Sequence, residues 1–225
     1  PSLQRLAREL EQAIRASSGK QITSCRIGSR DFAWGQRTYV MGILNVTPDS
    51  FSDGGACLSP DAAVRRAEAM AGEGADLIDV GGESSRPGAD AVPLEEELRR
   101  VIPVVEALSR RIAIPLSIDT VKAEVARRAL EAGASLINDI SALRSDPEMA
   151  PLAARTGTAV VLMHMRGTPR DMQTDPVYDD VTAEIGRFFE ERLRFAERRG
   201  ISPGRIILDP GIGFGKTVDH NLEII

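Results

Sequence analysis

The chain has 225 residues, 42% of them hydrophobic, and its 33 acidic and 28 basic side chains give a formal net charge of -5. That length supports one substantial core, and the charge balance excludes the basic field expected of a non-specific nucleic-acid binder. No apolar stretch approaches the roughly 20 residues that a membrane-spanning helix needs. Two cysteines, Cys25 and Cys57, lack metal-ligand spacing and the density of a disulfide scaffold, so we expect a cytoplasmic protein without membrane partners.

The first 38 residues read as an N-terminal extension. Residues 1–18 carry apolar side chains at helical spacing, interrupted by charges, which predicts a helix rather than a secretion signal. Residues 21–37 place Gly28-Ser29-Arg30-Asp31 between two β-prone stretches, which predicts a hairpin covering the lower end of the main domain. The expected division is therefore an extension over 1–38 and a main domain over 39–225.

Six short apolar runs follow, and each stops at a polar residue. The stops are Asn45, Asp79, Asp119, Asn138, His164 and Asp209. Helix signals lie between the runs, over 61–73, 93–110, 120–133 and 177–199. Alternating strands and helices imply a parallel sheet, and polar residues at the end of every strand favour the C-terminal rim of a closed (β/α)₈ barrel, the TIM barrel, over an open doubly wound sheet.

Only six βα units are recognisable, whereas a TIM barrel has eight in about 250 residues. Sixteen residues remain after Asp209 (225 minus 209), enough for a loop and one helix start near 219–225. We therefore expect an α/β barrel that stops before its seventh and eighth units, and an incomplete record of a complete protein.

Three of the polar strand ends suit a flat heterocycle. The carboxylates of Asp119 and Asp209 can accept paired N–H donors, and the amide of Asn138 can donate and accept on the same ring. The alternative is that each merely caps the helix that follows it, and for Asp119 alone the two interpretations are evenly balanced. Three such residues together favour a binding site.

Three loops after strand ends offer further chemistry. Residues 45–55 are rich in Asp, Ser and Gly and could order around a metal-bound anion, and Arg86 in 81–88 suits a phosphate leaving group. Both also fit ordinary solvated loops. Residues 209–217 match neither a Walker A loop nor a dinucleotide fingerprint, so their glycines more plausibly let the backbone approach a ligand. His164 reads as a hydrogen-bonded core residue slightly more than as a rim residue.

Five motifs in order resemble the dihydropteroate synthase family. They are Met-Gly-Ile-Leu-Asn-Val-Thr-Pro-Asp-Ser-Phe-Ser-Asp-Gly-Gly, Asp-Val-Gly-Gly-Glu-Ser-Ser-Arg-Pro-Gly, Ser-Ile-Asp-Thr, Ile-Asn-Asp-Ile and Leu-Asp-Pro-Gly-Ile-Gly-Phe-Gly-Lys. The resemblance implies a pterin-binding transferase that joins 7,8-dihydropterin-6-ylmethyl diphosphate to p-aminobenzoate, giving 7,8-dihydropteroate and diphosphate in folate biosynthesis. Alternatives are a pterin-dependent methyltransferase and a non-catalytic pterin-binding fragment. The family's later Ser-Arg-Lys and Arg-x-His segments have no counterpart here.

The same resemblance implies roles for individual residues. The catalytic candidates are Asn45, Arg86 and Asp119. The implied cofactor is Mg2+, and Asn45 is the residue implied to lie near it. The substrate-binding candidates are Ser85, Asp119, Asn138, Asp209, Phe51, Pro87, Phe214, Lys216 and Met163. Ser85 stands where the family more usually has threonine, a mild departure because the hydroxyl is kept. Sulfonamides are expected to compete with p-aminobenzoate, and a homodimer is a further expectation.

Overall fold

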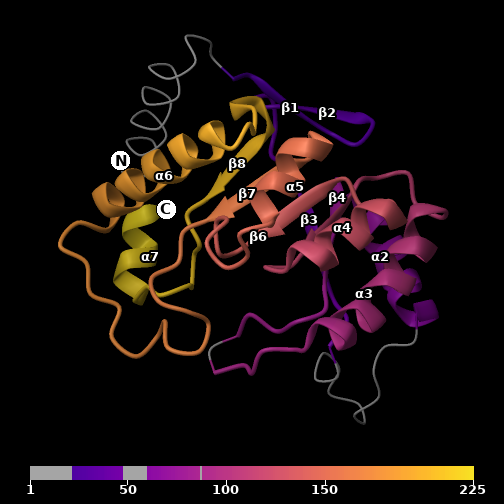
Figure 1. Cartoon of the computed structure of the whole chain (residues 1–225), viewed down its shortest axis with the longest axis horizontal. Coiled ribbons are helices and arrows are strands. Elements are labelled where there is room, and N and C mark those ends of the chain that lie inside the picture. The colour runs from indigo at the N-terminus through magenta and orange to yellow at the C-terminus, as the bar shows by residue number, and fades with distance from the viewer. Residues whose placement is uncertain (1–21, 48–59, 87) are drawn as a thin grey trace.

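The computed structural model of the chain describes residues 22–47, 60–86 and 88–225. Its centre is a six-stranded parallel sheet in which the strands follow one another in chain order, as Figure 1 shows. The strands are β3 (Met41–Asn45), β4 (Leu77–Gly81), β5 (Leu116–Asp119), β6 (Leu136–Asp139), β7 (Ala159–Met163) and β8 (Ile206–Asp209). Sequential parallel pairing of this kind confirms the expected α/β fold with six consecutive units of a barrel.

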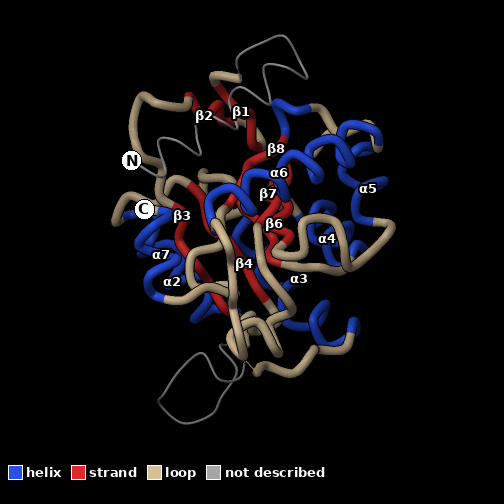
Figure 2. The backbone as a smooth tube through the Cα atoms, turned by 90° about the vertical axis from the view of Figure 1, so that its left-hand side faces the viewer, coloured by secondary structure: helices blue, strands red, loops and turns tan. Residues whose placement is uncertain are grey.

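Helices connect the strands and lie outside the sheet (Figures 1 and 2). They are α2 (Pro60–Gly72), α3 (Leu94–Ser109), α4 (Ala123–Ala132), α5 (Met149–Thr156), α6 (Val181–Arg198) and α7 (Val218–Ile224), with a 3₁₀ turn at Pro203–Arg205. Within the described residues, no helix is both long and apolar enough to cross a membrane.

Two helices differ from the sequence-based expectation. The sequence signals do not predict α5, which has only eight residues and whose N-cap residue, Glu148, makes no side-chain capping hydrogen bond. The expected start of α6 at Val177 is wrong by four residues: the side chain of Asp180 accepts a hydrogen bond from the backbone N–H of Ala183, so the helix begins at Val181.

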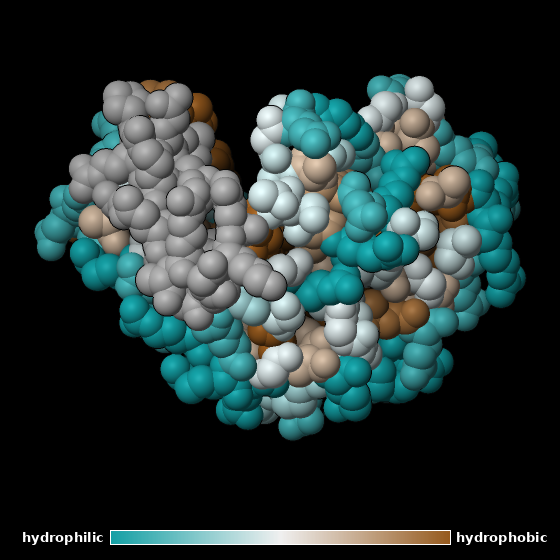
Figure 3. All heavy atoms as spheres, turned by 90° about the horizontal axis from the view of Figure 1, so that it is seen from above, coloured by the Kyte–Doolittle hydropathy of each residue, from teal (hydrophilic) through white to brown (hydrophobic). Residues whose placement is uncertain are grey.

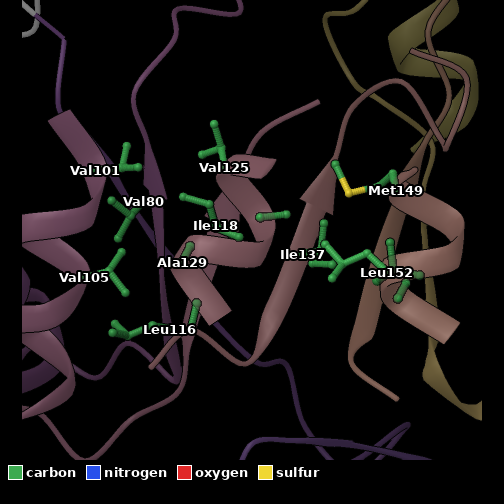
Figure 4. Close-up of a cluster of buried hydrophobic side chains, with 14 of the residues drawn as sticks. Val80, Val101, Val105, Leu116, Ile118, Val125, Ala129, Ile137, Met149 and Leu152 are labelled. Carbon is green, nitrogen blue, oxygen red and sulfur yellow. The ribbon is translucent and has the colours of Figure 1, made fainter. Parts of the chain in front are cut away.

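The outer face of the sheet packs against the helices through alternate strand residues. Val80, Ile118 and Ile137 point from β4, β5 and β6 toward the helices (Figure 4). They meet α3 and α4 through side chains such as Val101 and Val125, all of them fully buried. Because strand side chains alternate, burying this set turns Asp79, Asp119 and their neighbours to the opposite, inner face.

The lower half of the inner face is apolar and is closed by a hairpin of β1 (Ser24–Ile27) and β2 (Arg30–Ala33). Cys25, Ile27 and Phe32 pack there against Leu77, Leu136, Ala159 and Val161. The predicted cover is thus present, although the turn is only Gly28-Ser29 and the expected turn residues Arg30 and Asp31 belong to β2. The end that carries the hairpin is mostly hydrophilic, with small separate apolar patches (Figure 3).

The division of the chain at residue 38 stays a prediction. Residues 1–21, where a helix is expected, lie outside the described part of the structure. The segment between the hairpin and β3 is also tied to the barrel, because Arg37 donates hydrogen bonds to the carboxylate of Asp76 just before β4.

Candidate active site

The upper half of the inner face is a row of polar side chains in register. Asn45, Gly81, Asp119 and Asn138 are paired across the four neighbouring strands β3 to β6. Gly81 matters because it has no side chain: a Cβ there would lie 3.4 Å from Oδ1 of Asn45 and 3.3 Å from Oδ2 of Asp119. The amide and the carboxylate therefore border one common space above Gly81.

Asn138 is held in place by a carboxylate one layer below. Its Nδ2 donates a hydrogen bond to Oδ2 of Asp79 at 2.8 Å, which leaves the amide oxygen available to accept from a ligand. Asp79 is 4% exposed, and burial raises its pKa. Its other oxygen, Oδ1, has no hydrogen-bond partner among the described residues. Ser117, the register partner of Asp79 on β5, and Asn138 both act to lower the pKa of Asp79 against the effect of burial.

Asp119 is the most strongly perturbed carboxyl group of the rim. Burial, followed by the negative charges of Asp79, Glu97, Asp139 and Glu83, raises its pKa well above the ordinary value. It does not cap α4, because the backbone N–H of Ala123 is bonded instead by Asp146 at 2.8 Å. The capping alternative for Asp119 is therefore wrong, and its carboxylate, which is partly exposed, lines the cavity described below.

The loop after β8 carries the remaining predicted residues of this end. Asp209 accepts a hydrogen bond from the backbone N–H of Gly211 at 2.7 Å, and its carbonyl accepts one from the N–H of His164 at 2.8 Å. Phe214 packs against a buried cluster that contains Met163. The structure thus brings Met163, at the end of β7, and Phe214, in the β8 loop, together as one apolar wall.

The ammonium group of Lys216 bonds the protein backbone, whereas a substrate contact would need it to face a ligand. Its ammonium donates to the carbonyl oxygens of His164, Gly211 and Phe214 at 3.2, 2.9 and 3.0 Å. The side chain is buried, and burial lowers its pKa to about 8, with Asp209 acting in the opposite direction. All three hydrogen bonds of the ammonium group go to backbone carbonyls, so Lys216 links the β7 and β8 loops. Lys216 is therefore not one of the proposed substrate contacts.

We expect this burial to be visible as a pH dependence. Lysine in an unfolded chain has a pKa of about 10.4, so between about pH 8 and 10 the unfolded state binds more protons than the folded state, and stability rises with pH. Relative to Lys216→Met, the unfolding free energy of the wild type should increase by about 2 to 3 kcal/mol over this range. Urea unfolding of both proteins from pH 7 to 10 checks it; a difference that is flat or falls with pH contradicts it.

The second loop, residues 82–88, follows β4 directly after Gly81. Ser85 is half-buried, while Arg86 is exposed and makes no ion pair with any described residue. Gly82 packs so closely on α3 that an added Cβ would lie 2.6 Å from Val101. Phe51 and Pro87, both predicted to shape the second-substrate pocket, lie outside the described residues.

A cavity of about 360 Å³ opens beside Asp119 on this rim. Its walls come from the loops after β4, β5, β6 and β7, and include Ser85, Asp119 and Glu97. The backbone N–H of Gly88 donates to the carbonyl of Pro169 at 3.2 Å, so the β4 and β7 loops meet at the side of this cavity. Of the predicted residues that the structure describes, Ser85 and Asp119 line it, whereas Asn45, Arg86, Asn138, Met163, Asp209, Phe214 and Lys216 do not.

His164 is buried, as the sequence slightly favours, but the expected hydrogen bonding is not seen at Nδ1 of its ring, which has no partner among the described residues. Burial, and then the positive charges of Lys216 and Arg144, lower its pKa to about 3, so the ring is neutral at physiological pH. It lies edge-on to Phe188 with the ring centres 5.0 Å apart. A ring so far from protonation is a poor general acid.

Sequence reasoning missed three polar residues of this site: Asp79 as a partner of Asn138, and Glu97 and Lys122 beside Asp119. Asp79 could have been found, since a carboxylate inside an apolar strand at the same alternation as Asp119 is a buried polar group that needs a reason. Glu97 reads as one of three consecutive acidic residues at a helix start, and nothing in that pattern shows that it alone is buried.

Comparison with known proteins identifies the family of the chain. The model of the family described as pterin binding enzyme matches residues 41–225. The dihydropteroate synthases of Synechocystis and Escherichia coli are 50% and 54% identical over 88% and 83% of this chain, which covers 69% and 66% of their lengths. A Yersinia pestis dihydropteroate synthase in a sulfonamide drug complex superposes with a TM-score of 0.84 at 48% identity, covering 89% of this chain and 72% of that one. The Xanthomonas albilineans enzyme with 4-aminobenzoic acid gives 0.82 at 51%, with 90% and 71% covered.

A polar rim on a parallel α/β sheet, matched by a family model over most of the chain, defines a pterin binding enzyme, and the chain belongs to that family. Its relatives at about 50% identity place it among the dihydropteroate synthases, the transferases of folate biosynthesis. The chain spans about two thirds of the length of these curated relatives.

Proposed function

We propose that this chain contributes the pterin site and the reaction centre of a dihydropteroate synthase, joining 7,8-dihydropterin-6-ylmethyl diphosphate to p-aminobenzoate with release of diphosphate. The observation that carries the proposal is the row in register on the inner face, in which Asp119 and Asn138 are neighbours and Asp79 orients the amide. Relatives at about 50% identity with this activity support it. The methyltransferase and the passive binder have no comparable support.

In the proposed complex the pterin ring is recognised by polar strand ends. Asp119 accepts two parallel N–H donors from the amino-pyrimidine edge, and Asn138 accepts a third with the oxygen that Asp79 leaves free. Asp209 completes the set from β8. Binding of the pterin ring and ionisation of Asp119 favour each other. N–H donors of the ring stabilise the charged carboxylate and so counteract the rise in its pKa that burial causes.

The bond that breaks joins the pterin methylene to diphosphate, and the bond that forms joins that carbon to the arylamine nitrogen. No protein nucleophile is needed, because the leaving group departs with the electron pair and the ring system stabilises the cationic carbon. Arg86 and Ser85 are the proposed contacts of the departing diphosphate, which suits a guanidinium without an ion-pair partner among the described residues. The arylamine loses its proton after it attacks.

Magnesium, when bound, would neutralise part of the charge on the diphosphate. Asn45 is the proposed protein ligand, with one amide oxygen facing the space over Gly81. Among the described residues there is no group of three His, Cys, Asp or Glu side chains that could hold a metal on its own. This donor set fits Mg²⁺, which commonly takes few protein ligands together with substrate phosphates.

For the second substrate we propose an apolar slot beside the reacting carbon. Met163 and Phe214 form one wall of it, and Phe51 and Pro87 are assigned to it from the sequence alone. An aromatic ring held between such side chains would present its amine to the methylene and keep water away from the cation. Competition by sulfonamides at this slot, a cytoplasmic location and a homodimer are parts of the same proposal.

The decisive experiment is product formation by the full-length protein from dihydropterin diphosphate, p-aminobenzoate and MgCl₂, followed by mass spectrometry. The expected products are 7,8-dihydropteroate and one equivalent of diphosphate. Pterin binding in calorimetry without product would leave only a binder, and methyl transfer from a methylated folate would identify the methyltransferase instead. Omission of MgCl₂ tests the metal separately.

A further inference from the structure

A partly buried ion-pair triad connects the second loop to the body of the fold. The ammonium of Lys122 donates to Oε2 of Glu97 at 2.5 Å and also to Oε2 of Glu83. The Glu97 side chain is 1% exposed, against 25% for Lys122 and 26% for Glu83. The hydroxyl of Thr120 donates to the other oxygen of Glu97 at 2.6 Å, so both oxygens of the buried carboxylate are bonded.

The three charged residues come from three separate segments. Glu97 lies in the first turn of α3, Lys122 directly precedes α4, and Glu83 lies two residues before Ser85 in the second loop. Glu83, Glu97 and Asp119 all line the same cavity. The two carboxylates of the triad are therefore part of the wall of this cavity, and Lys122 bonds both of them.

We propose that Lys122 is a positioning residue for the reaction: it holds Glu83 against Glu97 and thereby fixes the loop that carries Ser85 and Arg86 where the diphosphate departs. This inference rests on the proposed function, because the leaving group is the one assigned there. The recognised unit is the diphosphate, and Lys122 acts on it only through the loop.

Among the described residues, the loop has other anchors to the rest of the fold only near its two ends. Arg100 donates to the carbonyl of Gly82 at 2.9 Å at the start, and the N–H of Gly88 bonds Pro169 at 3.2 Å at the end. Between them, Glu83 makes the one ion pair that the loop has with the described residues. Without it, the described residues would hold the segment that bears Ser85 and Arg86 only at its ends.

The energetics also favour a geometric role over a purely stabilising one. A buried ion pair adds little stability compared with apolar residues of the same size, yet it is costly to break on one side only, so it specifies one arrangement strongly. Burial opposes the charged form of Lys122, but its two carboxylate partners outweigh this and raise its pKa. The cation also offsets Glu83 and Glu97, two of the charges that raise the pKa of Asp119.

Three variants of the full-length protein test the inference. Glu83→Gln keeps the buried pair of Lys122 with Glu97 and so keeps the fold; Lys122→Met removes the cation; Lys122→Arg keeps it. For Glu83→Gln and Lys122→Met we expect kcat to fall about 10- to 100-fold, the range for a misplaced catalytic group. 6-Hydroxymethyl-7,8-dihydropterin has no diphosphate, so its calorimetric Kd should stay within about two-fold of the wild-type value. The Kd of inorganic diphosphate, measured in the presence of that pterin and MgCl₂, should rise about 10-fold or more. Lys122→Arg should recover most of both losses.

The matched control is Arg127→Met on the same helix, α4. It removes two ion pairs, to Glu124 and Glu131 at 2.5 Å each, but these are at the surface. We expect no change in kcat or in either Kd. Wild-type behaviour of Glu83→Gln, equal loss of simple pterin binding, or equal loss in the control would each overturn the inference. If the wild type forms no dihydropteroate, the proposed function fails, and the diphosphate Kd alone decides whether Lys122 positions the loop.

Discussion

Replacing Asp119 with asparagine is expected to weaken binding of 6-hydroxymethyl-7,8-dihydropterin by at least about 100-fold, or about 3 kcal/mol. The carboxylate can accept two N–H donors at once, whereas an amide turns one donor of its own toward the ligand. The register leaves no other carboxylate beside Asn138 at this height to take over, since Asp79 lies one layer below and is already bonded. Isothermal titration calorimetry at pH 7 measures the effect.

The same substitution is expected to stabilise the protein without ligand. The folded-state pKa of Asp119 lies well above the ordinary carboxyl value of about 3.9, so the wild type loses stability as the pH rises from about 4 through that folded-state pKa. The amide of the variant carries no charge at any of these pH values, so Asp119→Asn should be more stable than the wild type at pH 7, and the difference should shrink as the pH falls toward 4. Urea unfolding at both pH values measures this difference.

Opposite signs for binding and stability are the test of a functional carboxylate, because a merely structural one loses both or neither. Asp180→Asn is the control: that side chain caps α6 with a hydrogen bond to Ala183, which asparagine can also make, and it should change neither quantity. Tight pterin binding by Asp119→Asn, or a loss of stability at pH 7, would remove Asp119 from the proposed centre.

The polar rim could be predicted because strands impose a simple geometry. Parallel strands bring their carboxyl ends to one edge, and alternation puts every second residue on one face, so Asn45, Asp119 and Asn138 meet wherever their apolar neighbours are buried. A prediction based only on the strand ends nevertheless missed the hydrogen bond between Asp79 and Asn138. Counting back by two residues from Gly81 on the inner face would have included it.

The ion pairs of Lys122 and the backbone hydrogen bonds of Lys216 could not be predicted in the same way. Lys122 bonds Glu83 and Glu97, which are 39 and 25 residues away, and their pairing depends on how α3 and α4 pack rather than on any local pattern. Lys216 stands in a glycine-rich string that suggests a ligand contact, but the positive φ angles of Gly211, Gly213 and Gly215 curl the loop around its ammonium. The conformation of the loop therefore decided that the ammonium of Lys216 bonds backbone carbonyl oxygens.

That curl gives the largest expected effect on stability: Gly211→Ala should cost about 3 to 5 kcal/mol in urea unfolding. Gly211 has a φ of +68°, where an alanine is strained by about 1 to 2 kcal/mol. In addition, its Cβ would lie 2.1 Å from the carbonyl oxygen of His164, which is backbone and cannot turn away. Relief by moving the loop would break the hydrogen bond from Gly211 to Asp209, so pterin binding should fall as well.

Gly213→Ala separates the two causes, since Gly213 has a φ of +83° but open space around its Cβ position. It should cost only the backbone strain, about 1 to 2 kcal/mol, and leave Asp209 in place. Equal losses for the two alanines would mean that the close approach of the β8 loop to His164 does not exist in solution. A larger loss for Gly211→Ala would instead establish that approach as the feature that sets the height of Asp209 on the rim.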